Sequence, residues 1–173
     1  MLVSVDDFIL DINIPNTDTP AIIERLNGYI DKYEPIYLTQ LLGETLYTDF
    51  KAGLLEEPIP DKWMSLENAI TVEQIANFIY WHFVRKSNTY LSGVNTIVKP
   101  KTENSNQASP IDDMVFVWND MIDASYKTVK FIQENNADYG NYYLPGVLHL
   151  HYYGYCNWYR LPDIFHNQNS LNI

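Results

Sequence analysis

The most apolar long stretch of the chain covers residues 71–91, and its pattern predicts a buried central helix. Over residues 78–84 hardly any side of this helix would be polar, and a helix that is apolar nearly all round needs neighbours to cover it. Thr71, followed three residues later by Gln74, fits a capping box at its start. A Ser-Gly pair at 92–93 is expected to end it, because glycine commonly terminates helices. We therefore expect the rest of the fold to pack around this segment.

A second helical pattern begins after Thr19, which precedes Pro20. Proline suits the first helical position, because its missing N–H would have no helical partner there. Apolar residues then recur at the spacing of one buried face, at Ala21, Ile22, Leu26, Tyr29, Ile30 and Tyr33. Glu34 precedes Pro35, and the residue before a proline avoids the helical region. We therefore expect this helix to be interrupted there.

Two short helices are predicted after the interruption, at residues 35–42 and 44–52, with glycines at 43 and 53 as their stops. Their core contributions would be Leu38, Leu41, Leu42, Leu46 and Phe50. Residues 56–60 include two prolines and predict a loop, after which Asp61 is placed to begin a short helical turn. That turn carries Trp63, Met64 and Leu66.

The remaining segments outside the tail have weaker patterns. Residues 1–15 contain short apolar runs followed by turn residues, which predicts an arm or short strand. Residues 94–98 fit a short strand, and residues 99–109 have no apolar periodicity and predict a polar loop.

A second long helix should begin after Ser109 and Pro110, since serine can cap a helix and proline can take its first position. Its broad apolar face comprises Met114, Val115, Val117, Trp118, Met121, Ile122, Ala124, Thr128, Val129 and Ile132. Two long helices joined by a polar loop should pack antiparallel. The predicted fold class is mainly α: a compact bundle of two long and several short helices, with an extended N-terminal arm, a long polar loop and an irregular aromatic C-terminal tail.

We predict a single helical domain over residues 1–173, divided into an arm (1–17), a helical core (18–138) and an aromatic docking tail (139–173). The tail has little helical periodicity but many aromatic residues, which are the usual anchors of protein interfaces. It would lie back on the helices or be buried by a partner. The predicted interaction residues are Tyr142, Tyr143, Tyr152, Tyr153, Tyr155, Trp158 and Tyr159.

Composition narrows the classes of function. A chain of 173 residues with a formal net charge of −11 repels nucleic-acid phosphates, and no basic patch is evident in the sequence, since Lys99 and Lys101 are too few. Fourteen tyrosines favour contacts between proteins. The single cysteine, Cys156, excludes an internal disulfide framework. No apolar run approaches the roughly 20 residues that span a bilayer, so we predict a soluble protein made in the cytosol.

Motifs of the easily recognised enzymes, such as glycine-rich phosphate loops, H-E-x-x-H and G-x-S-x-G, are absent from the sequence. The best candidate metal ligands lie in the tail, at His149, His151, Cys156 and His166. A strand with solvent-facing histidines explains the spacing of the first two equally well, and we favour that interpretation. We therefore predict no catalytic residue, no metal and no cofactor.

Other reactive residues have simple structural explanations. His82 on the central helix is expected to be a satisfied or partly exposed histidine. Asp112 and Asp113 fit the electrostatics of a helix start better than a catalytic pair. Cys156 is expected to be a buried or inert thiol, because no base lies beside it in sequence.

The order of these features resembles the small helical head-to-tail connector, or adaptor, proteins of tailed phages, in the version found in phages of Bacteroides-like hosts. The resemblance lies in the opening VSVDDF, then YLTQLLGETLYTDF with its LLG and LY pair, then IANFIYWHFVRKS, a polar loop and a last long helix. It covers residues 1–135 in layout. The tail after residue 140 lies outside it.

The resemblance implies a non-enzymatic structural protein of the virion neck, made in the bacterial host cytoplasm. Such proteins form a ring, commonly of twelve copies, that joins the portal at the capsid vertex to the stopper or tail, and DNA passes through without specific binding. The partners would be the portal protein, other neck or tail proteins and further copies of the chain. A tail-completion or other neck protein, a protein-binding module of the host cell, and an enzyme using His149, His151 and Cys156 are the alternatives.

Overall fold

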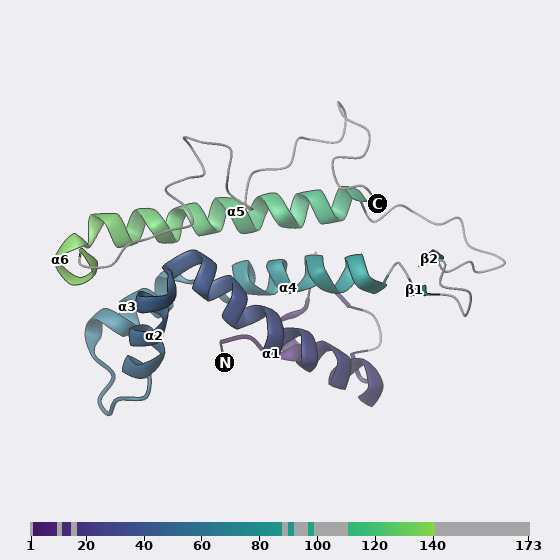
Figure 1. The fold of residues 1–173 in the computed structure, drawn as a ribbon, viewed down its shortest axis with the longest axis horizontal. Helices are drawn as coiled ribbons and strands as arrows, with labels where there is room; N and C mark the ends of the chain where they lie inside the picture. The colour runs from purple at the N-terminus through teal and green to yellow at the C-terminus, as the bar shows by residue number, and fades with distance from the viewer. Residues whose placement is uncertain are drawn as a thin grey trace.

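The computed structural model describes residues 2–9, 12–14, 17–87, 90–91, 97–98 and 111–140 (Figure 1). The elements in order are the 3-10 turn η1 (Val5–Asp7), α1 (Pro20–Leu42), α2 (Glu44–Gly53), α3 (Asp61–Ala69), α4 (Val72–Ser87), β1 (Tyr90–Leu91), β2 (Ile97–Val98), α5 (Ile111–Glu134) and α6 (Asn136–Tyr139). The fold is mainly α, as predicted from the sequence. The tail from residue 141 onward and the polar loop at 99–109 lie outside the described residues.

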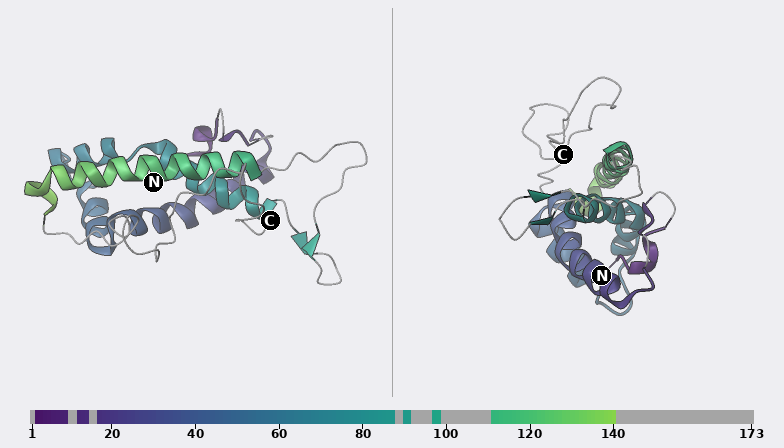
Figure 2. Two further views of the ribbon diagram at one scale, coloured as in Figure 1. Left: turned by 90° about the horizontal axis from the view of Figure 1, so that it is seen from above. Right: turned by 90° about the vertical axis from the view of Figure 1, so that its right-hand side faces the viewer.

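The two long helices α4 and α5 pack side by side and antiparallel, which confirms the predicted arrangement (Figure 1). In the end-on view of Figure 2, α1 and the N-terminal arm flank α4 on the side away from α5. Each neighbour covers part of α4, whose buried residues are Gln74, Ile75, Ala76, Asn77, Phe78, Ile79, Trp81 and Phe83. The central position of this helix therefore follows from its nearly continuous apolar surface.

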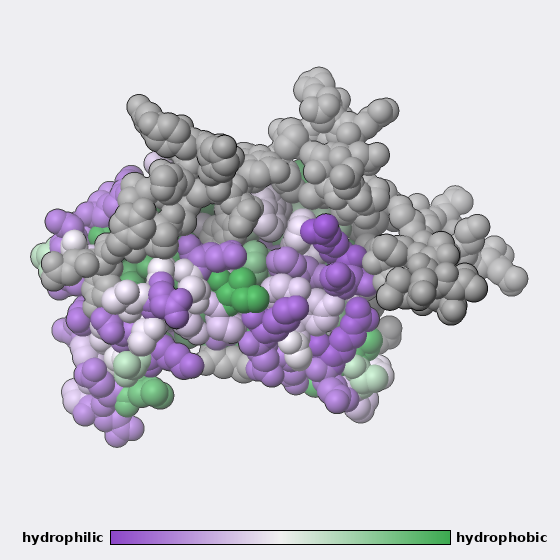
Figure 3. All heavy atoms as spheres, in the orientation of Figure 1, coloured by the Kyte–Doolittle hydropathy of each residue, from purple (hydrophilic) through white to green (hydrophobic). Residues whose placement is uncertain are grey.

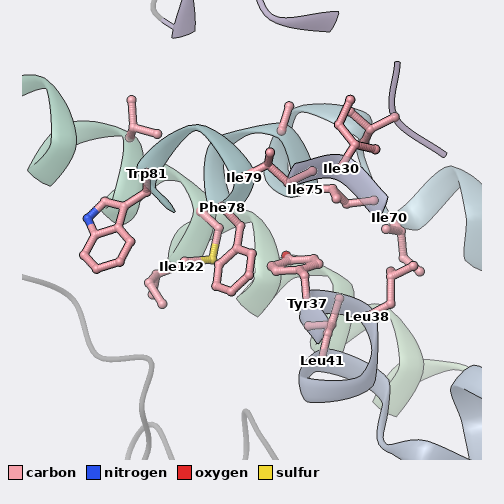
Figure 4. Close-up of a cluster of buried hydrophobic side chains, with 14 of the residues drawn as sticks. Ile30, Tyr37, Leu38, Leu41, Ile70, Ile75, Phe78, Ile79, Trp81 and Ile122 are labelled. Carbon is pink, nitrogen blue, oxygen red and sulfur yellow. The ribbon is translucent and has the colours of Figure 1, made fainter. Parts of the chain in front are cut away.

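Aromatic rings from three helices meet in the middle of the bundle, and Figure 4 shows Tyr37 of α1 next to Phe78 of α4. The ring of Phe78 on α4 lies 5.3 Å from that of Tyr37 on α1 and 6.3 Å from that of Trp118 on α5, centroid to centroid. Trp81 packs on Trp118 with centroids 4.8 Å apart. Offset and tilted pairs at these distances stabilise a core beyond the area they bury. The predicted apolar face of α5 is buried here, apart from Ala124, which is half-buried.

The predicted interruption at Pro35 is wrong, because α1 runs unbroken from Pro20 to Leu42 with Pro35 inside it. An internal proline costs about 3 kcal/mol, mainly through a lost hydrogen bond and a steric clash. Continuing the helix buries Leu38, Leu41 and Leu42, each 2% exposed or less. Each such burial contributes roughly 1.5–3 kcal/mol. The packing gain therefore exceeds the local cost.

Other predicted boundaries hold more closely. The helix α1 ends at Gly43, whose φ of 79° is the left-handed conformation that favours glycine. The helix α2 ends at Gly53, one residue beyond the prediction, and a side chain on Gly53 would collide with the indole of Trp63. The five core residues predicted for 35–52 are all buried. Residues 61–69 form the two-turn helix α3, in which Met64 is exposed while Trp63 and Leu66 are buried.

Both ends of α4 differ from the prediction. The Gln74 backbone N–H donates to Thr71 Oγ1 at 3.4 Å, but the Gln74 side chain faces Thr128 on α5 and so does not complete the capping box. The helix stops at Ser87 and not near 91, and Ser87 Oγ donates to the Phe83 carbonyl at 2.7 Å. Residues 90–91 pair antiparallel with 97–98, which confirms the second half of the strand predicted at 94–98.

The N-terminal arm is packed onto the bundle. Val3, Phe8, Ile12 and Ile14 are buried, and the Glu34 carboxylate accepts the backbone N–H groups of Leu2 and Val3 at 3.0–3.1 Å. At the other end of the bundle Tyr139, the first residue of the predicted tail, is 2% exposed, and its hydroxyl donates to the Lys62 carbonyl. The packed core therefore extends at both ends beyond residues 18–138.

Candidate interaction surfaces

The residues predicted for docking and for metal binding all lie in the tail, outside the described residues. Tyr142, Tyr143, Tyr152, Tyr153, Tyr155, Trp158 and Tyr159 thus remain a prediction, as do the metal candidates His149, His151, Cys156 and His166. In the part of the chain that the structure describes, no group of three or more His, Cys, Asp or Glu residues is placed to hold a metal ion. Asp112 and Asp113 occupy the first turn of α5, where the helix-start interpretation places them.

His82 is a partly buried aromatic neighbour of α1, as expected from the sequence. Its ring stacks on Tyr33 with centroids 4.1 Å apart and meets the edges of Phe78 and Trp81 at 4.7 and 4.9 Å. Burial, together with the positive charges of Arg85, Lys32 and Lys86, lowers the pKa of His82 to about 4. The imidazole is therefore neutral at pH 7, and its contribution there is packing.

Beside His82 a groove of about 530 Å³ opens between the first half of α1 and the end of α4. Its lining includes Glu24, Arg25, Gly28, Tyr29, Lys32 and Lys86, and we call it the cationic groove. Three cations and one carboxylate give these side chains a net charge of +2, which is unusual in a chain whose net charge is −11. The groove is therefore a local concentration of positive charge in an acidic chain.

Two of the three cations of this groove, Arg25 and Lys32, lie over aromatic rings. The Arg25 guanidinium carbon lies 4.8 Å from the Phe83 ring centroid, and its Nη2 donates to Ser87 Oγ at 2.9 Å. The Lys32 Nζ lies 4.9 Å from the Tyr33 ring centroid. Cation–π contacts of this kind fix the direction of a long side chain. The groove therefore presents preorganised positive charge.

A second surface of opposite character lies where the arm, the start of α4 and α5 meet. It surrounds a hollow of about 320 Å³ whose lining includes Asp7, Ile9, Val72, Glu73, Phe116 and Asp120, and we call it the acidic face. Ile9 and Phe116 are 57% and 54% exposed, which is unusual for large apolar side chains beside three carboxylates. Exposed apolar residues rimmed by charge are typical of sites that bind another protein.

The two surfaces lie on opposite sides of α4. Asn77 lines the hollow of the acidic face and Lys86 lines the cationic groove, and these residues are nine positions apart. Nine residues of an α-helix make two and a half turns, so the two side chains point in opposite directions from the axis. Glu73 and His82 have the same separation.

Sequence reasoning missed both surfaces. Arg25 and Lys32 are seven residues apart, which places them on one face of α1, and this spacing was a usable signal. Lys86 reaches the same groove only through the packing of α4 on α1. Among the described residues, the face shown in Figure 3 is mostly hydrophilic, with small separate apolar areas.

Within the described residues, no helix combines the length and the apolar character needed to cross a bilayer. No protein-family model, curated protein or solved structure matches this chain.

Proposed function

We propose that this chain is a non-enzymatic structural protein of a phage virion neck, which forms a ring joining the portal at the capsid vertex to the tail or stopper. The stretches on which the resemblance to connectors rests are packing elements of one bundle. Val3 and Phe8 of the opening segment are buried, as are Leu41, Leu42 and Gly43. The apolar residues of the third stretch form the buried surface of α4. The residues on which the resemblance rests are therefore ones that hold the fold together, and this supports a fold shared with the connectors.

The observation that carries the proposal is the distance between the places where the polar loop and the aromatic tail join the bundle. Residues 88–110 connect to the bundle at Ser87 and Ile111, and residues 141–173 connect to it after Gly140. These connections lie at opposite ends of α5 (Figure 1). A helix of 24 residues is about 36 Å long. A rigid bundle with attachment points that far apart suits a protein that bridges two components of a neck.

The experiment is native mass spectrometry of the full chain, alone and mixed with the assembled portal ring of the same phage. We expect the chain to load onto the portal in about the portal's own copy number, twelve in the connectors that the chain resembles. A portal ring from an unrelated phage is the control and should bind nothing. Binding to isolated tails but not to portals would overturn the proposal in favour of a tail-completion protein. Binding to neither would favour a module that is not part of the virion.

A further inference from the structure

We propose that copies of this chain associate head to tail, with the acidic face of one copy seated in the cationic groove of the next. The two surfaces have opposite charge, with Arg25, Lys32 and Lys86 on one side and Asp7, Glu73 and Asp120 on the other. Their charges are complementary, and such complementarity steers association and fixes its orientation. The inference deepens the ring component of the proposed function and rests on it.

Both surfaces also carry groups that a contact between proteins would bury. On the acidic face, Ile9 and Phe116 are large apolar side chains that are more than half exposed. In the cationic groove a Cβ on Gly28 would meet nothing within 4 Å, so the chain leaves space there for an incoming side chain. Tyr29 lines the same groove and offers an aromatic surface to it. Aromatic and apolar anchors inside a charged rim are the usual composition of a protein interface.

The placement of the surfaces decides the type of contact. Because they lie on opposite sides of α4, one copy cannot use both surfaces against the same partner. A contact between two different patches is heterologous, and repeated heterologous contacts generate a closed ring or an open filament. A symmetric dimer would instead require one self-complementary patch.

The test uses sedimentation velocity of the full chain over a range of concentrations and salt. Wild-type protein should form species larger than a dimer, and salt should weaken them because the contact is partly ionic.

Lys32→Glu/Lys86→Glu reverses the charge of the groove, and Glu73→Lys/Phe116→Ala disables the acidic face. Each variant should associate at least about tenfold more weakly than the wild-type protein. The control Lys127→Glu/Lys130→Glu makes the same charge change at exposed positions of α5 and should behave like wild type.

A mixture of the two disabled variants gives the sharpest result. The intact acidic face of the groove variant fits the intact groove of the other variant, so an equimolar mixture should form a heterodimer and stop there. Association unchanged in both variants, or a wild-type dimer that grows no further, would overturn the inference. A monomeric wild-type chain whose groove amides shift in NMR spectra on adding poly-glutamate would also overturn it, and would assign the groove to an acidic segment of another protein.

This assay contains only the one chain, so it separates the two proposals. Loading onto the portal by a chain that does not self-associate would overturn the head-to-tail contact and support the neck function. Self-association without portal binding would support the contact and overturn the function.

Discussion

The two halves of α1 share one continuous helix but differ in what surrounds them. In residues 34–42 five side chains are buried, Glu34, Tyr37, Leu38, Leu41 and Leu42, and none is basic. In residues 20–33 only Leu26 and Ile30 are buried, while Arg25 and Lys32 line the cationic groove. The second half is therefore built to hold the bundle together, and the first half is built to present a surface. Substitutions in the two halves should accordingly have different effects.

The largest effect is expected from Leu41→Ala in the second half. Leu41 is 0% exposed, and removing a buried leucine side chain costs about 2–5 kcal/mol through lost burial and the cavity left behind. The control is Ile22→Ala in the first half, where the side chain is only half-buried and about 1 kcal/mol or less should be lost. Urea denaturation followed by circular dichroism measures both. Equal losses would contradict the distinction between the halves.

The next largest effect is expected from Glu34→Ala. The Glu34 carboxylate accepts the N–H groups of Leu2 and Val3, and Val3 is buried, so the substitution leaves donors without this acceptor. Leaving buried donors unpaired costs about 1–3 kcal/mol. Hydrogen exchange at the Leu2 and Val3 amides should accelerate more than exchange in α5. Glu24→Ala, at an exposed position in the first half, is the control and should change neither quantity.

Glu34 also shows where sequence reasoning reached its limit. The starts of α1, α2 and α5, the two glycine stops and the antiparallel pairing of α4 with α5 follow from local pattern, and each was predicted. The continuity of α1 through Pro35 depends on burial and on a contact between residues 32 positions apart, which no local pattern contains. The same holds for Gln74, whose side chain binds Thr128 on α5 and not its own helix start.

The candidate surfaces were harder to predict than the fold for a related reason. The aromatic stripe of Tyr29 and Tyr33 was assigned to a buried face, and both residues are in fact half-buried at the edge of the cationic groove. A sequence shows which residues share a helix face. How many of those residues are buried depends on where the neighbouring helix packs. Lys86 joins Arg25 and Lys32 only after α4 has packed on α1.

A smaller effect, which depends on pH, is expected from His82 on α4, whose ring stacks on Tyr33 at the end of the first half of α1. Because burial and nearby cations lower the pKa of His82 to about 4 from 6.5, the folded chain favours the neutral imidazole. The unfolded chain binds this proton first as pH falls, so the stability due to His82 is complete above pH 6.5 and is lost between 6.5 and 4. Between pH 7.5 and 5 we expect a loss of about 1 kcal/mol, below the full value because the ring is partly exposed and its charges are screened.

His82→Phe is the matched variant for this measurement. It keeps a ring against Tyr33 and Phe78 but removes the titrating group. The difference between wild type and variant in urea midpoint, taken at pH 7.5 and pH 5, isolates His82 from the carboxylates that titrate in the same range. A difference that does not change with pH would show that the folded environment does not disfavour the charged imidazole.

The smallest effect has the opposite sign and concerns Gly28 in the first half of α1. Glycine inside a helix is about 0.5–1 kcal/mol less favourable than alanine, and the site offers open space for a Cβ. Gly28→Ala should therefore stabilise the chain by about that amount in urea denaturation.

Gly28→Gln should also remain at least as stable as wild type, but its longer side chain occupies the groove and should weaken self-association. A Gly28→Gln variant that is as stable as wild type but associates more weakly would show that this position serves the surface and not the fold. If Gly28→Gln instead associated as well as wild type, the open space at Gly28 would have no part in the contact between copies.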